Sequence, residues 1–281
     1  MRRKGFQKAW RLISEAALHV LAGGGAVIMA LPFIWMLSTS FKPESEVFQF
    51  PPRFIPNTIT VANYINLFQR LNFTRYFLNT SLVAISITLG SLFINSLAGY
   101  AFAKIKFRGR DPLFMGILAT MMVPGSVTLI PSYLLIKSLG MVNTYAGLIL
   151  PGLASAFGIF LMRQFIRTIP DELIEAAQID GASEFWIFLN IILPLSKPAL
   201  ATFGLFTFMG SWNSFLWPLI IATDERMYTL PVAIAVLRGQ HGGEFALQMA
   251  GAAVVVAPIL IVFLLLQRYY ISGIALTGMK G

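Results

Sequence analysis

Side chains that could carry out acid–base, nucleophilic or metal chemistry are scarce in this sequence. It contains no cysteine and only two histidines, His19 and His241. Glu15 and His19 lie one helical turn apart at the edge of an apolar run, where snorkelling explains them more simply than a proton relay. No GxxxxGK[ST] phosphate loop occurs. We therefore predict no catalytic residue, no metal site and no cofactor bound by this chain. If the chain takes part in an uphill process, the energy must come from another subunit.

Charged side chains gather instead in residues 168–198, inside an otherwise membrane-like sequence. Pro170 suits a first helical turn, and Asp171 and Glu172 place negative charge at the positive end of the helix dipole. Gly181 is a typical helix stop, and Ser183 is a plausible N-cap for a second helix. The pattern predicts a short acidic helix, a break and a second helix.

One face of the first helix carries small side chains. Leu173, Ala176, Ala177 and Asp180 recur at helical spacing, so the face carries two methyl-sized side chains beside a carboxylate. Such a face can be approached closely, which suits docking into a groove on a partner. The alternative is an ordinary solvated loop between membrane spans.

The spacing in this segment resembles the EAA signature of the membrane subunits of ATP-binding-cassette importers. The matching positions are Glu175, Ala176, Ala177, Gly181, Ile191, Leu193 and Pro194. In that family the loop is the coupling helix, which fits a cleft in the ATPase subunit. The resemblance implies that the ATPase-coupling residues of this chain are Glu175, Ala176, Ala177, Asp180, Gly181 and Ala182.

The composition of the 281 residues, with 57% hydrophobic and 12% charged side chains, is that of a membrane protein, and the spans given below predict an all-α integral membrane protein. The basic residues sit at the ends of hydrophobic runs instead of forming one patch, so we expect no nucleic-acid partner. About six runs have the length that a helix needs to cross a bilayer, and the first is expected to be an uncleaved span. The predicted spans are 17–39, 78–102, 112–136, 145–166, 199–222 and 245–267.

The distribution of Lys and Arg predicts the orientation of these spans. Of the 21 basic residues, fourteen fall on the side of both termini and of residues 168–198, and seven fall on the other side. The positive-inside rule then places both termini and the acidic segment in the cytoplasm. On the opposite side, residues 41–77 are expected to form an ordered loop with a short helix near 61–69.

Neutral polar and aromatic side chains suggest a solute path. Ser211, Trp212, Asn213 and Trp217 cluster on the fifth predicted span, and Asn95 lies on the second. Aromatic faces can stack on the C–H faces of a sugar while amides and hydroxyls bind its hydroxyl groups. Trp also anchors helices at interfaces, and Ser or Asn often joins helices by hydrogen bonds. Both interpretations remain open.

Further short stretches resemble the carbohydrate-importer branch of these permeases, similar to the second membrane subunit of maltose-type systems. The stretches are 40–43, 98–101, 107–110, 162–165, 212–213, 228–231 and 279–281. The resemblance implies a type I importer fold in a bacterial or archaeal cell membrane, made of residues 1–76, a permease core at 77–270 and a tail at 271–281. It also implies a homologous second permease, two ATPase subunits that bind ATP and Mg²⁺, and an extracytoplasmic solute-binding protein that delivers the carbohydrate.

In the maltose-type relatives the tail reaches toward the ATPase, so the resemblance implies such a contact for Gly278, Met279, Lys280 and Gly281. Most sugar contacts in those relatives come from the other permease, which weakens a substrate role for Trp212 and Asn213. Two other classes compete with the importer: a self-sufficient secondary carrier or channel for a neutral polar solute, and a membrane enzyme, for which no residue set is present.

Overall fold

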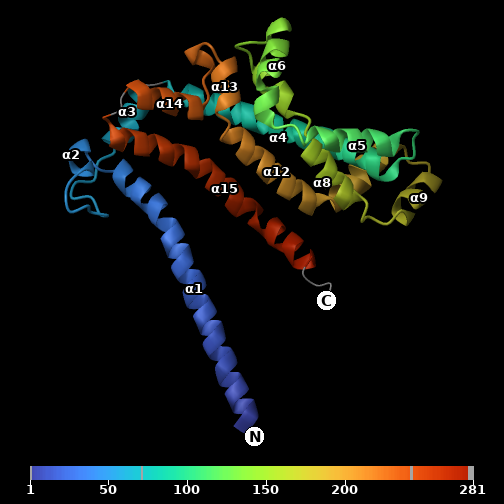
Figure 1. Cartoon of the computed structure of the whole chain (residues 1–281), viewed down its shortest axis with the longest axis horizontal. Helices are drawn as coiled ribbons and strands as arrows, with labels where there is room; N and C mark the ends of the chain where they lie inside the picture. Colours follow the sequence, from blue (N-terminus) through green and yellow to red (C-terminus); the bar gives the residue numbers. More distant parts are fainter. Residues whose placement is uncertain (1, 71, 241–242, 278–281) are drawn as a thin grey trace. The chain divides into compact units, whose positions relative to one another are not determined.

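The computed structural model describes residues 2–70, 72–240 and 243–277, and every regular element in these ranges is a helix (Figure 1). His241 and the four tail residues named above lie outside the described residues. His19 makes a local contact, its Nδ1 lying 2.6 Å from the backbone oxygen of Glu15. The α-helices are α1 Arg2–Ser40, α2 Glu44–Val47, α3 Ala62–Arg70, α4 Phe73–Lys104, α5 Arg110–Thr120, α6 Gly125–Ser138, α7 Tyr145–Ile149, α8 Ala156–Ile166, α9 Glu172–Ile179, α10 Glu184–Ile187, α11 Leu193–Leu195, α12 Lys197–Trp212, α13 Leu216–Ile221, α14 Leu230–Gln240 and α15 Phe245–Thr277. Three short helices of other types are η1 Leu150–Gly152, η2 Phe188–Ile192, which is a π-helix, and η3 Glu225–Met227.

Three helices in the described residues are long and apolar enough to cross a membrane by themselves: Ser14–Ser40, Phe73–Lys104 and Phe245–Leu265. Three further pairs of consecutive helices, each bent at a short break, are long and apolar enough when the two helices of a pair are taken as one. Counting each pair as one span gives up to six spans. This agrees with the predicted number. The third pair differs from the prediction, since it joins Glu184–Leu195 to Lys197–Trp212 with a bend of 82°, whereas the fifth span was predicted at 199–222.

Prolines lie at each of the three bends. Pro124 precedes α6 at the point where α5 and α6 meet at 100°, Pro151 lies in η1 before α8, and Pro198 lies in the first turn of α12, after the bend at Ser196. A proline lacks the N–H that would continue the helix ladder, which explains a break at each site. A separate break at 213–215 divides α12 from α13 and contains no proline.

The chain divides into two compact units. Among the described residues, unit 1 consists of the chain up to residue 70 together with Leu237–Val254. The predicted helix near 61–69 is present there as α3. Glu44 caps the start of α15, because its two carboxylate oxygens accept hydrogen bonds from the backbone N–H groups of Phe245 and Ala246, each at 2.9 Å. Lys42 is buried, donates to the backbone oxygen of Arg53 at 2.6 Å, and lies 4.3 Å from the ring centre of Trp35.

Unit 2, which contains Asn72–Val236 and the described chain from Val255 onward, is built around α4. α4 packs against α8 and α12, and glycines allow the close approach of α4 and α8. A Cβ atom added at Gly99 would lie 2.7 Å from the Cβ of Met162 and 2.9 Å from the backbone nitrogen of Arg163. The backbones of α4 and α8 are therefore in direct contact at Gly99.

We expect the Gly99→Val substitution to destabilise unit 2 severely, because overpacking against a backbone atom typically costs about 1–3 kcal/mol or more. The measurement is the thermal unfolding midpoint of the purified protein in detergent. Gly116→Val is the matched control, since a Cβ at Gly116 meets nothing within 4 Å. Equal midpoints for the two variants would contradict the packing of α4 on α8.

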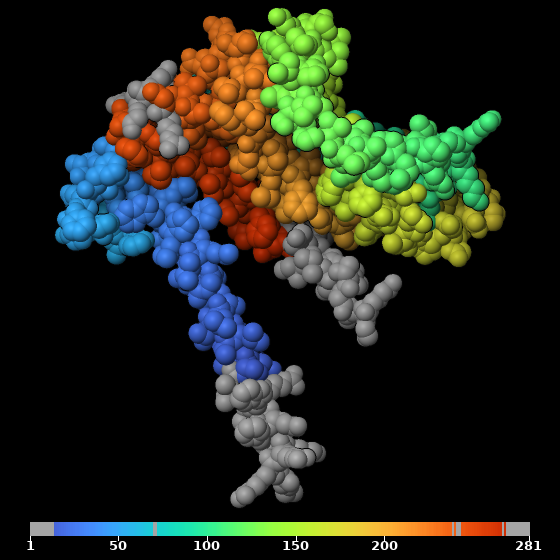
Figure 2. All heavy atoms as spheres, viewed as in Figure 1, coloured from blue at the N-terminus to red at the C-terminus, as the bar shows by residue number. Residues whose placement is uncertain are grey.

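α6 projects from the rest of unit 2 (Figure 2). Most of its side chains are exposed, including the large apolar side chains of Val127, Ile130, Leu134 and Leu135. In a membrane protein such a helix faces lipid or another subunit.

Candidate functional site

The acidic segment predicted to couple the chain to a partner forms a helix and a tight turn at one end of unit 2 (Figure 1). α9 ends at Ile179, and Gly181 follows in the left-handed conformation with φ of +83°. The N–H of Gly181 donates to the oxygen of Gln178 at 3.0 Å, and that of Ala182 donates to the oxygen of Ala177 at 2.9 Å. These two bonds form a Schellman motif, which favours glycine at its left-handed position.

The second helix begins at the predicted N-cap. The side-chain oxygen of Ser183 accepts a hydrogen bond from the N–H of Trp186 at 3.3 Å, and α10 starts at Glu184. The chain continues through the π-helix η2 into α11. This path turns residues 184–195 back over α9, so the two helices of the segment face each other.

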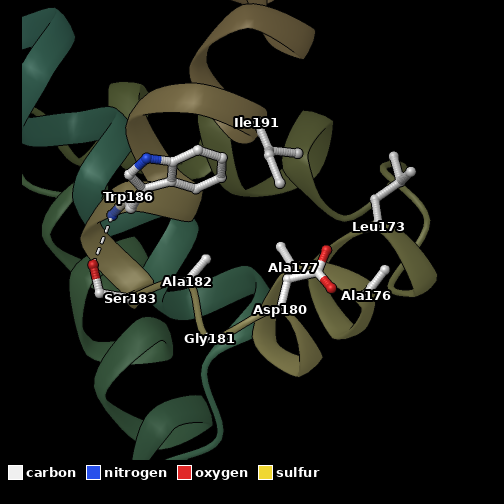
Figure 3. A pocket seen from close by; sticks show the side chains of 9 residues that line it. All are labelled: Leu173, Ala176, Ala177, Asp180, Gly181, Ala182, Ser183, Trp186 and Ile191. Atoms are coloured by element: carbon white, nitrogen blue, oxygen red, sulfur yellow. Dashed lines mark hydrogen bonds between the residues drawn. The ribbon is translucent and has the colours of Figure 1, made fainter.

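A groove of about 730 Å³ lies between these helices. Figure 3 shows Trp186 and Ile191 on one wall, facing Leu173 and Ala176 across an open space. The lining residues are Leu173, Ala176, Ala177, Asp180, Gly181, Ala182, Ser183, Trp186 and Ile191. The small face predicted from the sequence therefore lines the groove, with Ala176 exposed and Ala177 half-buried, and the structure adds an indole and an aliphatic side chain opposite it. Glu175 is exposed beside the groove and does not line it.

A first set of hydrogen bonds ties this segment to the end of α4. The hydroxyl of Tyr100 donates to one carboxylate oxygen of Glu184 at 2.6 Å. The amide of Gln178 donates to the other oxygen at 2.7 Å. Glu184 thus joins α4, α9 and α10 at one point.

Lys104, the last residue of α4, makes a second tie. Its ammonium group donates to the carboxylate of Asp171 at 2.6 Å and also to the backbone oxygen of Ile169, and its side chain is 7% exposed. The hydrogen bond and the charge of Lys104 lower the pKa of Asp171 below its ordinary value. Because this pKa is depressed in the folded protein, the contribution of the pair is present above the ordinary pKa of an Asp and is lost only as the pH falls through the lower value.

The underside of the segment is packed against the same helices. Ile174, Ile187 and Phe188 are buried in one cluster with Tyr100 of α4 and Met162 of α8. The outer face bears the groove while the inner face is part of the core. Force applied at the groove would therefore be transmitted to α4 and α8.

We expect Lys104→Met to weaken this connection, because it removes both hydrogen bonds of the ammonium group and its ion pair with Asp171. If the segment couples the chain to an ATPase, as the resemblance to the EAA signature implies, the expected result is a transport rate lowered about threefold to tenfold with basal ATP hydrolysis retained. The measurement compares transport and hydrolysis in the same vesicles. Lys106→Met is the matched control, since Lys106 is exposed and makes no hydrogen bond among the described residues. Equal coupling in the two variants would exclude this role of Lys104.

The structure places most of the candidate substrate-path residues inside the helix packing. Trp212 is 2% exposed and donates its indole N–H to the oxygen of Val255 at 3.0 Å. Trp217 donates to the oxygen of Gly147 at 3.0 Å, and Asn95 is fully buried between Ser91 and the break before α8. In this structure their polar atoms are engaged by the protein. Asn213 is exposed at the break after α12, and Ser211 is half-buried beside it.

Residues 93–275 match the family model described as "Binding-protein-dependent transport system inner membrane component". This range takes in the groove, both ties to α4 and the helices beneath them. The chain belongs to this family of importer permeases.

Curated relatives of the permease match nearly its full length. The arabinooligosaccharides transport system permease protein AraQ of Halalkalibacterium halodurans is 36% identical over 259 residues, covering 91% of this chain and 93% of the relative. The sn-glycerol-3-phosphate transport system permease protein UgpE of Escherichia coli is 34% identical over 275 residues, covering 95% and 97%. Both are permease proteins of transport systems.

A solved structure resembles the permease closely. It is described as a bacterial ABC transporter involved in the import of the acidic polysaccharide alginate, and the match has a TM-score of 0.82 with 26% identity, covering 92% of this chain and 96% of that chain. The predicted family and the all-helical type I importer fold are therefore confirmed. The permease is a multi-pass membrane subunit of a binding-protein-dependent ABC importer.

Three features of the permease's coupling segment were not predicted from its sequence. They are the groove wall formed by Trp186 and Ile191, the junction at Glu184, and the tie between Lys104 and Asp171. No contact was predicted for Glu184, and no local rule connects residues as far apart as Lys104 and Asp171. The only indication in the sequence was that a basic residue, Lys104, and an acidic residue, Asp171, lie at the ends of the segments that become neighbours.

Proposed function

We propose that this permease carries a carbohydrate across the membrane and that the segment 168–198 receives the driving force from an ATPase subunit. The observation that carries the proposal is the exposed groove, whose supporting helix is hydrogen-bonded and packed to α4 and α8. ATP binding would close two ATPase subunits. The docked segment would move with its ATPase, and α4 and α8 would move with the segment.

Each coupling residue has a distinct proposed role. Ala176 and Ala177 allow close approach of the ATPase, since larger side chains would fill the groove that they line. Glu175 and Asp180 present exposed carboxylates for polar or ionic contacts. Gly181 and Ala182 form the Schellman turn that sets the angle between α9 and α10.

We also propose the remaining partners. A second, homologous permease would cover the exposed apolar side chains of α6 and complete the translocation path. Two ATPase subunits would bind ATP and Mg²⁺, while this chain would bind no cofactor, hold no metal and catalyse no reaction. An extracytoplasmic solute-binding protein would deliver the solute. The host membrane would be the cell membrane of a bacterium or archaeon, and the tail residues Gly278, Met279, Lys280 and Gly281 would contact the ATPase.

A carbohydrate is the proposed solute because the names of a relative and of a solved structure mention carbohydrates. These are arabinooligosaccharides for the AraQ relative and alginate for the solved transporter. The UgpE relative is described by sn-glycerol-3-phosphate, a phosphorylated polyol. Among the candidate path residues, the exposed Asn213 at the helix break is the one best placed to meet a solute, because broken membrane helices commonly form substrate sites. A direct role for the buried Trp212 is not proposed.

The test is reconstitution. The permease is purified with its neighbouring gene products and placed in vesicles with ATP inside and the binding protein with a labelled oligosaccharide outside. The proposal predicts uptake that requires the ATPase, the binding protein and ATP together. Uptake by the permease alone would instead establish the self-sufficient carrier or channel.

A further inference from the structure

A second cavity lies beside the coupling segment, on the side of α8, and its lining is almost entirely charged. Its volume is about 510 Å³. The residues that line it are Ala103, Lys104, Arg110, Asp111, Arg163, Arg167 and Asp171. Four of these side chains are cations and two are carboxylates, so the cavity carries an excess of positive charge.

The two carboxylates are already engaged. Asp171 lies 2.6 Å from Lys104, and Asp111 lies 3.2 Å from Arg110 and 3.7 Å from Arg163. Arg167 has no hydrogen bond or ion pair with another described side chain. Arg163 must share Asp111 with Arg110, although the Arg163 side chain is only 12% exposed. A partly buried cation without a full counter-charge costs free energy, which a bound anion would recover.

The guanidinium group of Arg163 is held in place for such an anion. Arg163 donates from Nε to the backbone oxygen of Phe102 at 3.1 Å, and its guanidinium carbon lies 4.0 Å from the ring centre of Phe114. Arg110 and Asp111 are the first residues of α5, so the positive end of that helix dipole also lies at the cavity. Arg163 therefore presents a fixed guanidinium group beside Arg110, and the planar fork of a guanidinium group matches the oxygen geometry of a phosphate group.

The location of the cavity indicates the source of the phosphate group. α4 ends at Lys104, α8 ends at Ile166 and α5 begins at Arg110, so three membrane helices end around the cavity. Figure 1 shows α5 and α8 reaching the end of unit 2 where α9 lies. Helix ends mark the headgroup level of a bilayer, and basic pockets at the cytoplasmic side attract anionic headgroups.

We propose that this cavity is a binding site for a phosphate group, supplied by the headgroup of an anionic phospholipid. Arg110, Arg163 and Arg167 bind the phosphate oxygens, while Lys104 stays paired with Asp171. The site is distinct from the groove. It rests on the proposed function only because the proposed function places this end of the helices at the cytoplasmic side of the membrane. A bound headgroup would hold the ends of α5 and α8 next to the coupling segment.

The test uses the complete transporter purified in detergent and carrying Arg110→Gln together with Arg167→Gln. Native mass spectrometry measures retention of added phosphatidylglycerol against phosphatidylcholine, and calorimetry measures binding of inorganic phosphate. We expect phosphatidylglycerol retention to fall about tenfold or more in the double variant, because two of the three arginines that bind the phosphate oxygens lose their charge. The matched control is Lys106→Gln together with Arg108→Gln, two exposed cations of the same loop that do not line the cavity.

The two arms distinguish the sources of the phosphate. If the double variant loses phosphatidylglycerol retention and the control variant does not, the ligand is a lipid headgroup. If the double variant loses only the binding of inorganic phosphate, the site is filled by phosphate from solution. Unchanged binding in both arms would overturn the proposal. If both stay unchanged and the ATPase no longer co-purifies, the cavity binds an acidic segment of the ATPase and the proposal is wrong. ATP-dependent uptake is also measured in the control variant. If that uptake is retained, the proposed function holds, and unchanged lipid binding in the double variant then contradicts only the phosphate site.

Discussion

The Ala176→Trp variant is expected to lose the ATPase subunit on purification, and transport should fall to background. Ala176 lines the groove directly opposite Trp186 and Ile191, so an indole at this position fills the space that a partner would occupy (Figure 3). A clash at the centre of an interface commonly costs several kcal/mol, which corresponds to a loss of affinity of about a hundredfold or more. The measurement is the amount of ATPase that co-purifies with tagged permease.

The control for this variant is Leu195→Trp. Leu195 is exposed, belongs to the same segment and does not line the groove, so its substitution adds the same side chain at a different place. It should co-purify with the ATPase as the unaltered chain does. Normal ATPase binding by Ala176→Trp would show that the groove is not the docking surface.

Gly181→Val is expected to assemble with the ATPase and yet transport at least about tenfold more slowly. A Cβ at Gly181 meets nothing within 4 Å, so the effect comes from the backbone, whose φ of +83° strains a β-branched residue. Left-handed backbone typically costs a non-glycine residue about 1–2 kcal/mol. The turn would relax toward another conformation and change the angle between α9 and α10. Transport and ATP hydrolysis measured in the same vesicles report the loss of coupling.

Gly140→Val separates coupling from general destabilisation. Gly140 follows α6 with φ of +69°, its Cβ would also meet nothing within 4 Å, and the same pair of backbone hydrogen bonds surrounds it. The two variants should therefore lose similar stability. We expect Gly140→Val to keep transport within about twofold, and equal losses in the two variants would assign the effect to stability alone.

The local features of the coupling segment could be predicted because local rules determine them. The left-handed turn at Gly181 and the N-cap at Ser183 each depend on residues within one helical turn, and both are present. The small face of α9 follows from helical periodicity, and its exposure agrees with the prediction that it can be approached closely. The ATPase contacts of these residues stay a prediction.

The bends and the substrate path depend on tertiary structure. The 100° angle between α5 and α6 could not be predicted from Pro124, because a proline interrupts a helix without determining the direction in which the chain continues. The break at 213–215 contains no proline or glycine, so the span 199–222 was predicted as continuous. A polar residue on an apolar helix can face a path or a neighbouring helix with the same sequence pattern. Trp212 and Asn95 bond to backbone oxygens of distant segments, which the sequence cannot reveal.

One further element was missed for the same reason. Residues 230–240 were predicted only as part of an external loop, and they form the helix α14. Its first residue is held by α4, because the N–H of Leu230 donates a hydrogen bond to the hydroxyl of Thr80 at 2.7 Å. Contacts of this range are decided by packing and not by local pattern.

The most direct test of the account is a single thiol in the groove. Because the sequence contains no cysteine, Ala177→Cys provides a unique attachment site. In the assembled transporter a short thiol crosslinker at this position should join the permease to the ATPase, and a membrane-impermeant maleimide should label the free permease only from the cytoplasmic side. Labelling from the outer side, or no crosslink to any subunit, would contradict the coupling role of residues 168–198.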